Sequence, residues 1–175
     1  MMQIINRFRR AREGLAAIEF ALIVPLMLVT FFGVAEIASY ILVARKVANV
    51  ASSAADLVSQ DTVINDDEMS DIMGALDVVL RPFDPEEAQM RITSVIADDN
   101  GETTVGWSDA RNTTAYTPGA PIDVPDGIVP NGQGIIMTEV SCTYRTLFGM
   151  YLTSGMTVSD TFYLKPRRST TVERQ

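Results

Sequence analysis

The sequence contains no histidine and only one cysteine and one tryptophan among its 175 residues. The absence of histidine excludes Ser-His and Cys-His catalysis and removes a common ligand of zinc sites. Because Cys142 is the only cysteine, the chain can form neither an internal disulfide nor a thiolate cluster. Bases are also outnumbered: the formal net charge of −8 argues against wrapping of nucleic acid around the protein.

The charged residues are unevenly distributed. Residues 1–14 are basic, residues 61–139 are strongly acidic, and residues 165–175 are basic again. The basic side chains of the first region are Arg7, Arg9, Arg10 and Arg12. The short basic head (residues 1–14) and the long acidic body that follows suggest that the two parts lie in different environments, separated by a membrane or a similar boundary.

An apolar segment separates the head from the body. Residues 15–35 read LAAIEFALIVPLMLVTFFGVA and contain one ionisable side chain, Glu19. As a helix this segment covers roughly 30 Å, the thickness of bilayer hydrocarbon. A buried core helix would be hard to cover in so small a domain, and a cleaved secretory signal would have a shorter apolar run. We therefore predict an uncleaved transmembrane helix over residues 15–36.

The basic residues also predict the orientation of this helix. Four arginines precede the span, whereas Arg45 and Lys46 lie about ten residues beyond it. The positive-inside rule then places residues 1–14 in the cytoplasm as a basic leader. Residues 37–175 become one extracytoplasmic domain.

The helical pattern continues beyond the span. Small and apolar residues recur at spacings of three and four from Ile37 to Val58, and no proline or glycine interrupts residues 34–60. This predicts one helix from about Leu15 to Ser59, bent at Pro25. We expect the protein's own sheet to cover the apolar stripe of its outer half, with contact to other subunits as the alternative.

The remaining sequence predicts a small α+β domain. A short amphipathic helix is expected at Asp66–Leu80. Alternating apolar residues and an Asn-Gly turn predict an antiparallel sheet, with Val105 and Trp107 on one face. Its expected strands are Met90–Ile96, Glu102–Trp107, Ile135–Arg145 and Met156–Leu164. The segment 108–134 holds four prolines and four glycines; it is either a surface that other subunits contact or, as we favour, a mobile excursion.

Glu19 is the candidate functional residue of the span. A carboxylate there is costly unless it is paired. In one interpretation it lies near the cytoplasmic interface and pairs loosely with an arginine. In the other, cleavage after Gly14 exposes an α-amine at Leu15, one helical turn from Glu19, and the amine of this or a neighbouring chain neutralises the acid.

The arrangement of basic leader, glycine and apolar helix with glutamate at the fifth position resembles type IV prepilins. More closely, RRAREGLAAIEFALIVPLMLVTFFGVAEIASY resembles the N-terminal block of TadE/TadG-like proteins. These proteins belong to the bacterial tight-adherence (Flp-type) pilus assembly system. The stretches TEVSCTYRTLFG and SDTFYLKPRRSTTV near the C-terminus are also similar to that family.

The resemblance implies a pilin-like fold and a minor pilin or pseudopilin of the inner membrane, incorporated into a pilus in some cases. Its implied partners are membrane lipid, other pilus subunits, the inner-membrane assembly platform and a prepilin peptidase. Gly14 would precede the cut, Leu15 would be the mature N-terminus, and Glu19 would be the assembly glutamate. Phe20 stands where this system often has tyrosine or phenylalanine. If the head is retained, the chain would instead be an anchored assembly factor.

Other chemistry is not indicated. Asp98 to Glu102 superficially resembles a calcium loop, but its glycine is fourth instead of sixth, so a turn is expected. Cys142 lies on an apolar strand face and is expected to be a buried small hydrophobe. We predict no enzymatic activity, no metal, no cofactor and no nucleic-acid partner. The rival hypotheses are a single-span anchored binding or sensing module and, more weakly, an envelope hydrolase.

Overall fold

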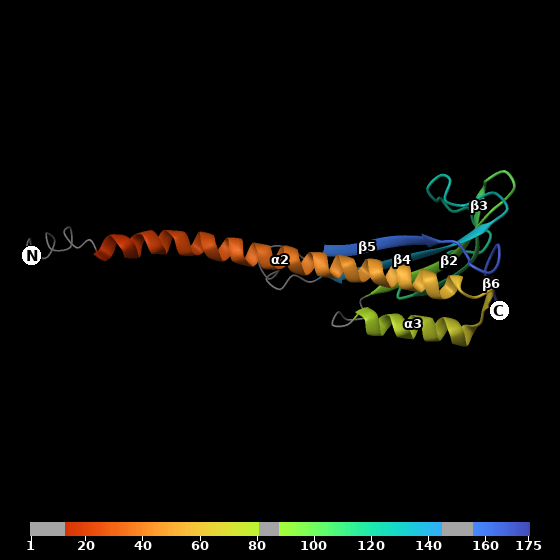
Figure 1. Ribbon diagram of the computed structural model, residues 1–175, viewed down its shortest axis with the longest axis horizontal. Helices are drawn as coiled ribbons and strands as arrows, with labels where there is room; N and C mark the ends of the chain where they lie inside the picture. The colour runs from red at the N-terminus through yellow and green to blue at the C-terminus, as the bar shows by residue number, and fades with distance from the viewer. Residues whose placement is uncertain (1–12, 81–87, 145–155) are drawn as a thin grey trace, which may run out of the picture.

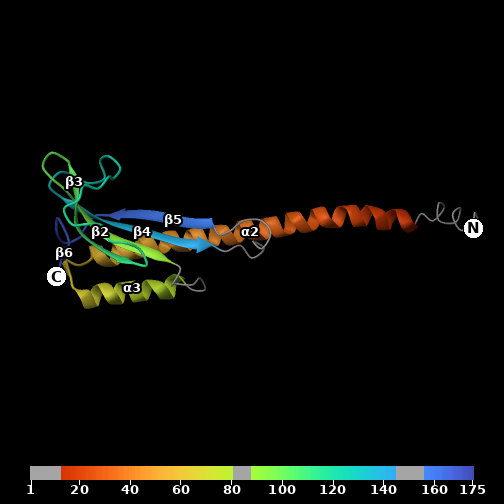
Figure 2. The ribbon, with the colours of Figure 1, turned by 180° about the vertical axis from the view of Figure 1, so that it is seen from behind.

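A computed structural model describes residues 13–80, 88–144 and 156–175. It shows a long helix whose second half lies against an antiparallel four-stranded sheet, while its first half projects away from the domain (Figures 1 and 2). This is the predicted α+β arrangement. The elements, in chain order, are α2 (Glu13–Ser59), β1 (Val63–Ile64), α3 (Asp66–Leu80), β2 (Gln89–Ala97), β3 (Thr103–Arg111), β4 (Gly134–Tyr144), β5 (Met156–Leu164) and β6 (Glu173–Arg174).

The long helix α2 has 47 residues and so extends for about 70 Å. It begins two residues before the predicted start and ends at the predicted Ser59. Pro25 lies inside it and does not end it. The second half is buried along one side from Val43 to Val58, because the sheet covers the alanine-rich stripe as predicted.

The sheet has the strand order β3-β2-β4-β5, with every neighbouring pair antiparallel. One face packs against α2, chiefly through β4 and β5. Alanines of α2 are completely buried there, and their small side chains allow close approach of helix and sheet. The buried residues of this interface include Val47, Ala51, Ala54, Ile92, Ile136, Val140 and Val158.

A bulge in β3 corrects the predicted register. Trp107 pairs with Ser94, but Val105 pairs with Val95, so the register shifts between these pairs. Directly opposed residues of an antiparallel pair point to the same side, and therefore Val105 and Trp107 face opposite sides of the sheet, not one. The residue between them is Gly106, where a Cβ atom would lie 2.8 Å from the Ile96 side chain.

The short helix α3 has the predicted bounds. A reciprocal capping box fixes its start: the Glu68 amide donates to Asn65 Oδ1 at 2.9 Å, and the Asn65 amide donates to Glu68 Oε2 at 3.1 Å. Met69 and Met73 are buried and join the core formed by α2 and the sheet. The amphipathic pattern of α3 therefore reflects core packing.

The proline- and glycine-rich segment after β3 forms a second apolar cluster on the other side of the sheet. Its side chains pack around Val95, Ile135 and Met137; they are Tyr116, Ile122, Val124, Ile128 and Val129. Backbone hydrogen bonds also join residues 119–122 to the edge of β3. The segment packs against the sheet as part of the domain, whereas its composition favoured a mobile excursion.

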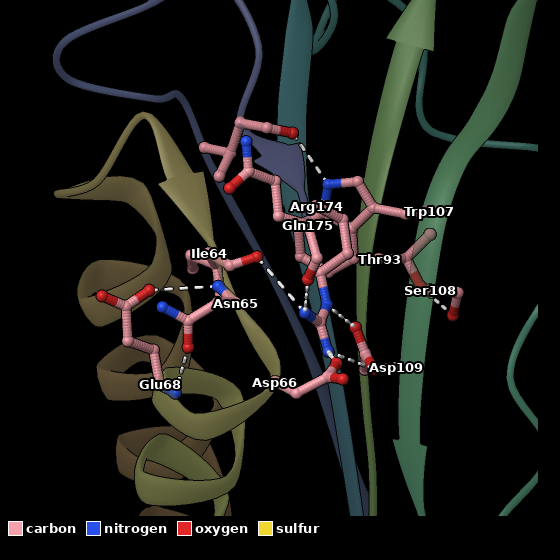
Figure 3. A network of polar contacts seen from close by, with 11 residues as sticks. Ile64, Asn65, Asp66, Glu68, Thr93, Trp107, Ser108, Asp109, Arg174 and Gln175 are labelled. Atoms are coloured by element: carbon pink, nitrogen blue, oxygen red, sulfur yellow. Dashed lines mark hydrogen bonds and ion pairs between the residues drawn. The ribbon is translucent and has the colours of Figure 1, made fainter.

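The C-terminal residues return to the start of α3 and complete the domain (Figure 3). Strand β6 pairs in parallel with β1. The Trp107 indole donates to the Val172 carbonyl at 2.7 Å. Arg174 donates to Asp109 at 2.8 Å and to Asp66 at 2.7 Å, so one guanidinium joins the sheet to α3.

Candidate membrane anchor and assembly site

The first half of α2 is apolar and exposed along its whole circumference. It includes an 18-residue window with a mean hydropathy of 2.4 and no buried residue. By length and composition, α2 can therefore cross a membrane. The large exposed side chains of this half are Leu15, Ile18, Phe20, Leu22, Ile23, Leu26, Met27, Leu28, Val29, Phe31, Phe32 and Val34.

The residues predicted from the prepilin-like pattern lie at the beginning of this surface. Gly14 is the second residue of α2. Leu15, Glu19 and Phe20 are all exposed. Leu15 and Glu19 are four residues apart in the helix, so they occupy the same side one turn apart. The structure thus preserves the spacing on which a contact between a mature α-amine and the acid depends.

The predicted basic leader lies outside the described residues. This applies to Arg7, Arg9, Arg10 and Arg12. Their part in orientation stays a prediction from the sequence, as does the processing of the chain after Gly14.

A polar contact that the sequence did not predict lies where the apolar half of α2 meets the domain. The Tyr144 hydroxyl donates to Glu36 Oε1 at 2.9 Å, and the ring of Tyr144 packs edge-on against Tyr40 with centroids 6.3 Å apart. Burial, followed by the hydrogen bond to Glu36, raises the pKa of Tyr144. The two partners are 108 residues apart. The one signal in the sequence is that an acid, Glu36, directly follows the apolar run of residues 15–35.

The packed loop and the start of β3 line a hollow of about 660 Å³. The loop lies at the end of the domain remote from the start of α2 (Figure 1). The lining of the hollow includes Glu102, Asp123 and Asp126. Within the described ranges, no group of three or more His, Cys, Asp or Glu side chains is arranged to hold a metal ion. Asp98, beside the hollow, accepts hydrogen bonds from the Asn100 and Glu102 amides. These bonds, chiefly that from Glu102, lower the pKa of Asp98 and define the predicted turn.

The fold and the site define a class: a chain with one exposed apolar helix of membrane-spanning length and a small α+β domain built on the helix's other half. A model of the family described as TadE-like protein matches residues 14–56, which confirms the resemblance over most of α2. No curated protein and no solved structure matches the chain.

This match and the apolar helix fit a membrane-anchored, pilus-associated protein. The match includes Gly14, Leu15, Glu19 and Phe20 but not the four arginines of the leader.

Proposed function

We propose that this protein is a minor pilin or pseudopilin, or an anchored assembly component, of a tight-adherence pilus. The first half of α2 inserts it into the bacterial inner membrane with the N-terminus inside and the domain outside. The observation that carries the proposal is the exposed apolar run of residues 15–35, which contains a single acid, Glu19, within a TadE-like segment. So large an apolar surface on a small domain indicates a membrane or a partner.

Glu19 supplies the specific step of this proposal. An ionised carboxylate in hydrocarbon is strongly disfavoured until an opposite charge approaches it. The α-amine of a chain that begins at Leu15 supplies that charge when helices come together in the membrane. Release of the desolvation penalty then favours entry of the subunit into an assembly of pilus subunits at the platform.

The native N-terminus tests the processing step. Intact-mass measurement of the protein isolated from its own cells should give a chain that begins at Leu15, as expected for cleavage by a prepilin peptidase. A chain that keeps residues 1–14 would exclude the processed pilin and favour the anchored assembly factor.

Replacement of Glu19 tests the assembly step. Glu19→Gln keeps the shape of the side chain and removes its charge, so we expect normal protein in the membrane and a loss of at least tenfold in subunit incorporation or pilus number, about 1.4 kcal/mol. Glu173→Gln, at an exposed position of the domain outside the hollow, is the matched control. If Glu19→Gln leaves both quantities unchanged, Glu19 has no assembly role.

A single-span binding or sensing module is the second candidate, and the hollow lined by Glu102, Asp123 and Asp126 favours it. Deletion of the protein distinguishes the two. Loss of pili supports the pilus component, whereas normal pili with loss of a response to an extracytoplasmic ligand support the binding module.

A further inference from the structure

The apolar surface of α2 is longer on one side of the helix than on the other. On the side that faces the domain it ends at Glu36, whose carboxylate accepts the hydrogen bond from Tyr144. On the opposite side it continues through Val34, Ile41 and Leu42, which are 67%, 44% and 61% exposed. The next exposed residue on that side is Arg45.

At the turn of residues 40–43, the domain-facing side and the outward side of α2 therefore have different surroundings. Beside Ile41 and Leu42, the adjoining turn of α2 contributes Val43, which is completely buried, and Tyr40, which packs on Tyr144. Protein covers one side of this turn. The other side presents aliphatic side chains that the described residues of the domain leave open.

We propose that lipid covers this outward side as far as Leu42, so that α2 leaves the bilayer at a steep tilt with the domain on the upper side of the leaning helix. The inference rests on the proposed insertion of the first half of α2. Glu36 and Tyr144 then lie at the same depth as Leu42, at the edge of the hydrocarbon. Arg45 lies at the level of the phosphate headgroups, which its guanidinium can bind.

The dimensions of the helix give the angle. The apolar surface ends at Glu36 on the side that faces the domain and at Leu42 on the outward side. This difference of six residues is about 9 Å along a helix that is about 10 Å wide, which corresponds to a tilt of about 40°. The outward surface from Ala16, which lies five turns before Val34, to Leu42 is about 39 Å long. At this tilt it covers about 30 Å along the bilayer normal, which matches the hydrocarbon thickness of roughly 30 Å. An upright helix would either expose Leu42 to water or draw Glu36 and Tyr144 into the hydrocarbon, and tilting is a common response to such a mismatch.

Lipid fits this surface better than a second copy of the chain does. The surface continues the apolar anchor, with no charged residue between Val34 and Leu42 on the outward side. Beyond Leu42 the same side becomes polar within one turn, at Arg45 and then Asn49. A contact between subunits would be expected to continue along the second half of α2, whereas the outward surface becomes polar where a headgroup layer would begin.

Nitroxide depth measurement in lipid nanodiscs tests the proposal on the full-length chain. Single cysteines replace Ile23, Ser39, Leu42 or Asn49 in a Cys142→Ala background, and relaxation by oxygen and by an aqueous nickel complex gives the depth of each label. We expect Ile23→Cys deep in hydrocarbon and Asn49→Cys in water. The label on Leu42→Cys should lie in lipid. Its depth should nearly equal that of the label on Ser39→Cys, because Ser39 is on the side of the tilted helix nearer the sheet. Circular dichroism checks that each variant is folded.

Each other outcome has a defined meaning. An upright helix would place Ser39→Cys about 4.5 Å deeper than Leu42→Cys, which overturns the tilt. A Leu42→Cys label in water while Ile23→Cys is in lipid overturns the lipid contact but keeps the anchor. A Leu42→Cys label shielded from both reagents shows that protein covers the surface and likewise overturns the proposal. An Ile23→Cys label in water means that the proposed membrane insertion itself fails.

Discussion

The hydrogen bond between Tyr144 and Glu36 joins the end of the sheet to the middle of α2. Glu36 is half-buried, and its second oxygen, Oε2, is buried without a hydrogen-bond partner in the described part of the chain. The carboxylate therefore depends on the Tyr144 hydroxyl, since an unsatisfied buried acceptor carries a desolvation cost.

Removal of that hydroxyl should destabilise the domain. We expect Tyr144→Phe to lower the free energy of unfolding by about 1–2 kcal/mol, because Glu36 Oε1 loses its donor. Chemical denaturation of the full-length chain in detergent measures the change. Tyr163→Phe is the control, because no described hydrogen bond involves that hydroxyl, and an equal loss in both variants would contradict the assigned contact.

Alkaline pH should show the same contact. Because the pKa of Tyr144 is raised in the folded state above its ordinary value of 10.0, the folded protein holds this proton more tightly than the unfolded chain does. Its contribution to stability is fully present below pH 10 and is lost as pH rises through the folded pKa. The decline in stability above pH 10 should be shallower in Tyr144→Phe. Equal slopes for the variant and the parent would refute the raised pKa.

Among the elements, α3 is specified almost entirely by local sequence. Acids occupy its first turn and the capping box links Asn65 with Glu68. Both signals connect residues within one turn, so its bounds could be predicted from the sequence. The bulge in β3 could not be predicted in this way. It is created by the pairing of β3 with β2, and alternation within β3 alone placed Val105 on the wrong face.

The cap of α3 should be measurable on its own. Asn65→Ala should cost about 1 kcal/mol, because the Glu68 amide loses its acceptor. Asn65→Ser restores a side-chain oxygen and should recover most of the loss. Amide hydrogen exchange in the first turn of α3 gives a local measurement alongside chemical denaturation. Similar exchange in Asn65→Ala and the parent would show that packing alone holds the start of the helix.

At the scale of the whole molecule, the C-terminal residues connect parts that are distant in sequence. Arg174 binds Asp109 of β3 and Asp66 of α3, and its side chain is only 18% exposed. Hydrogen bonding to Asp109 is the main cause that raises the pKa of Arg174. The guanidinium therefore remains charged, and the ion pairs persist across the physiological pH range.

Loss of Arg174 should weaken the attachment of α3 and of the C-terminal residues together. We expect Arg174→Ala to lower the free energy of unfolding by about 2 kcal/mol, because Asp109 keeps a partly buried charge without its partner. Arg168→Ala removes the same charge from an exposed position and should cost less than about 0.5 kcal/mol. Thermal unfolding of both variants tests this, and equal losses would contradict the role of Arg174.

The sequence by itself determined the apolar run of membrane-spanning length, the long helix, α3 and the existence of an antiparallel sheet. These follow from periodicity, local caps and the length of an apolar run, all of which act between near neighbours. Tertiary structure alone decided the bulge in β3, the packing of the proline-rich loop on Val95, the Arg174 ion pairs and the Glu36–Tyr144 contact. Each joins residues far apart in the chain, so its energy depends on how the sheet and the helices are packed, which no local pattern records.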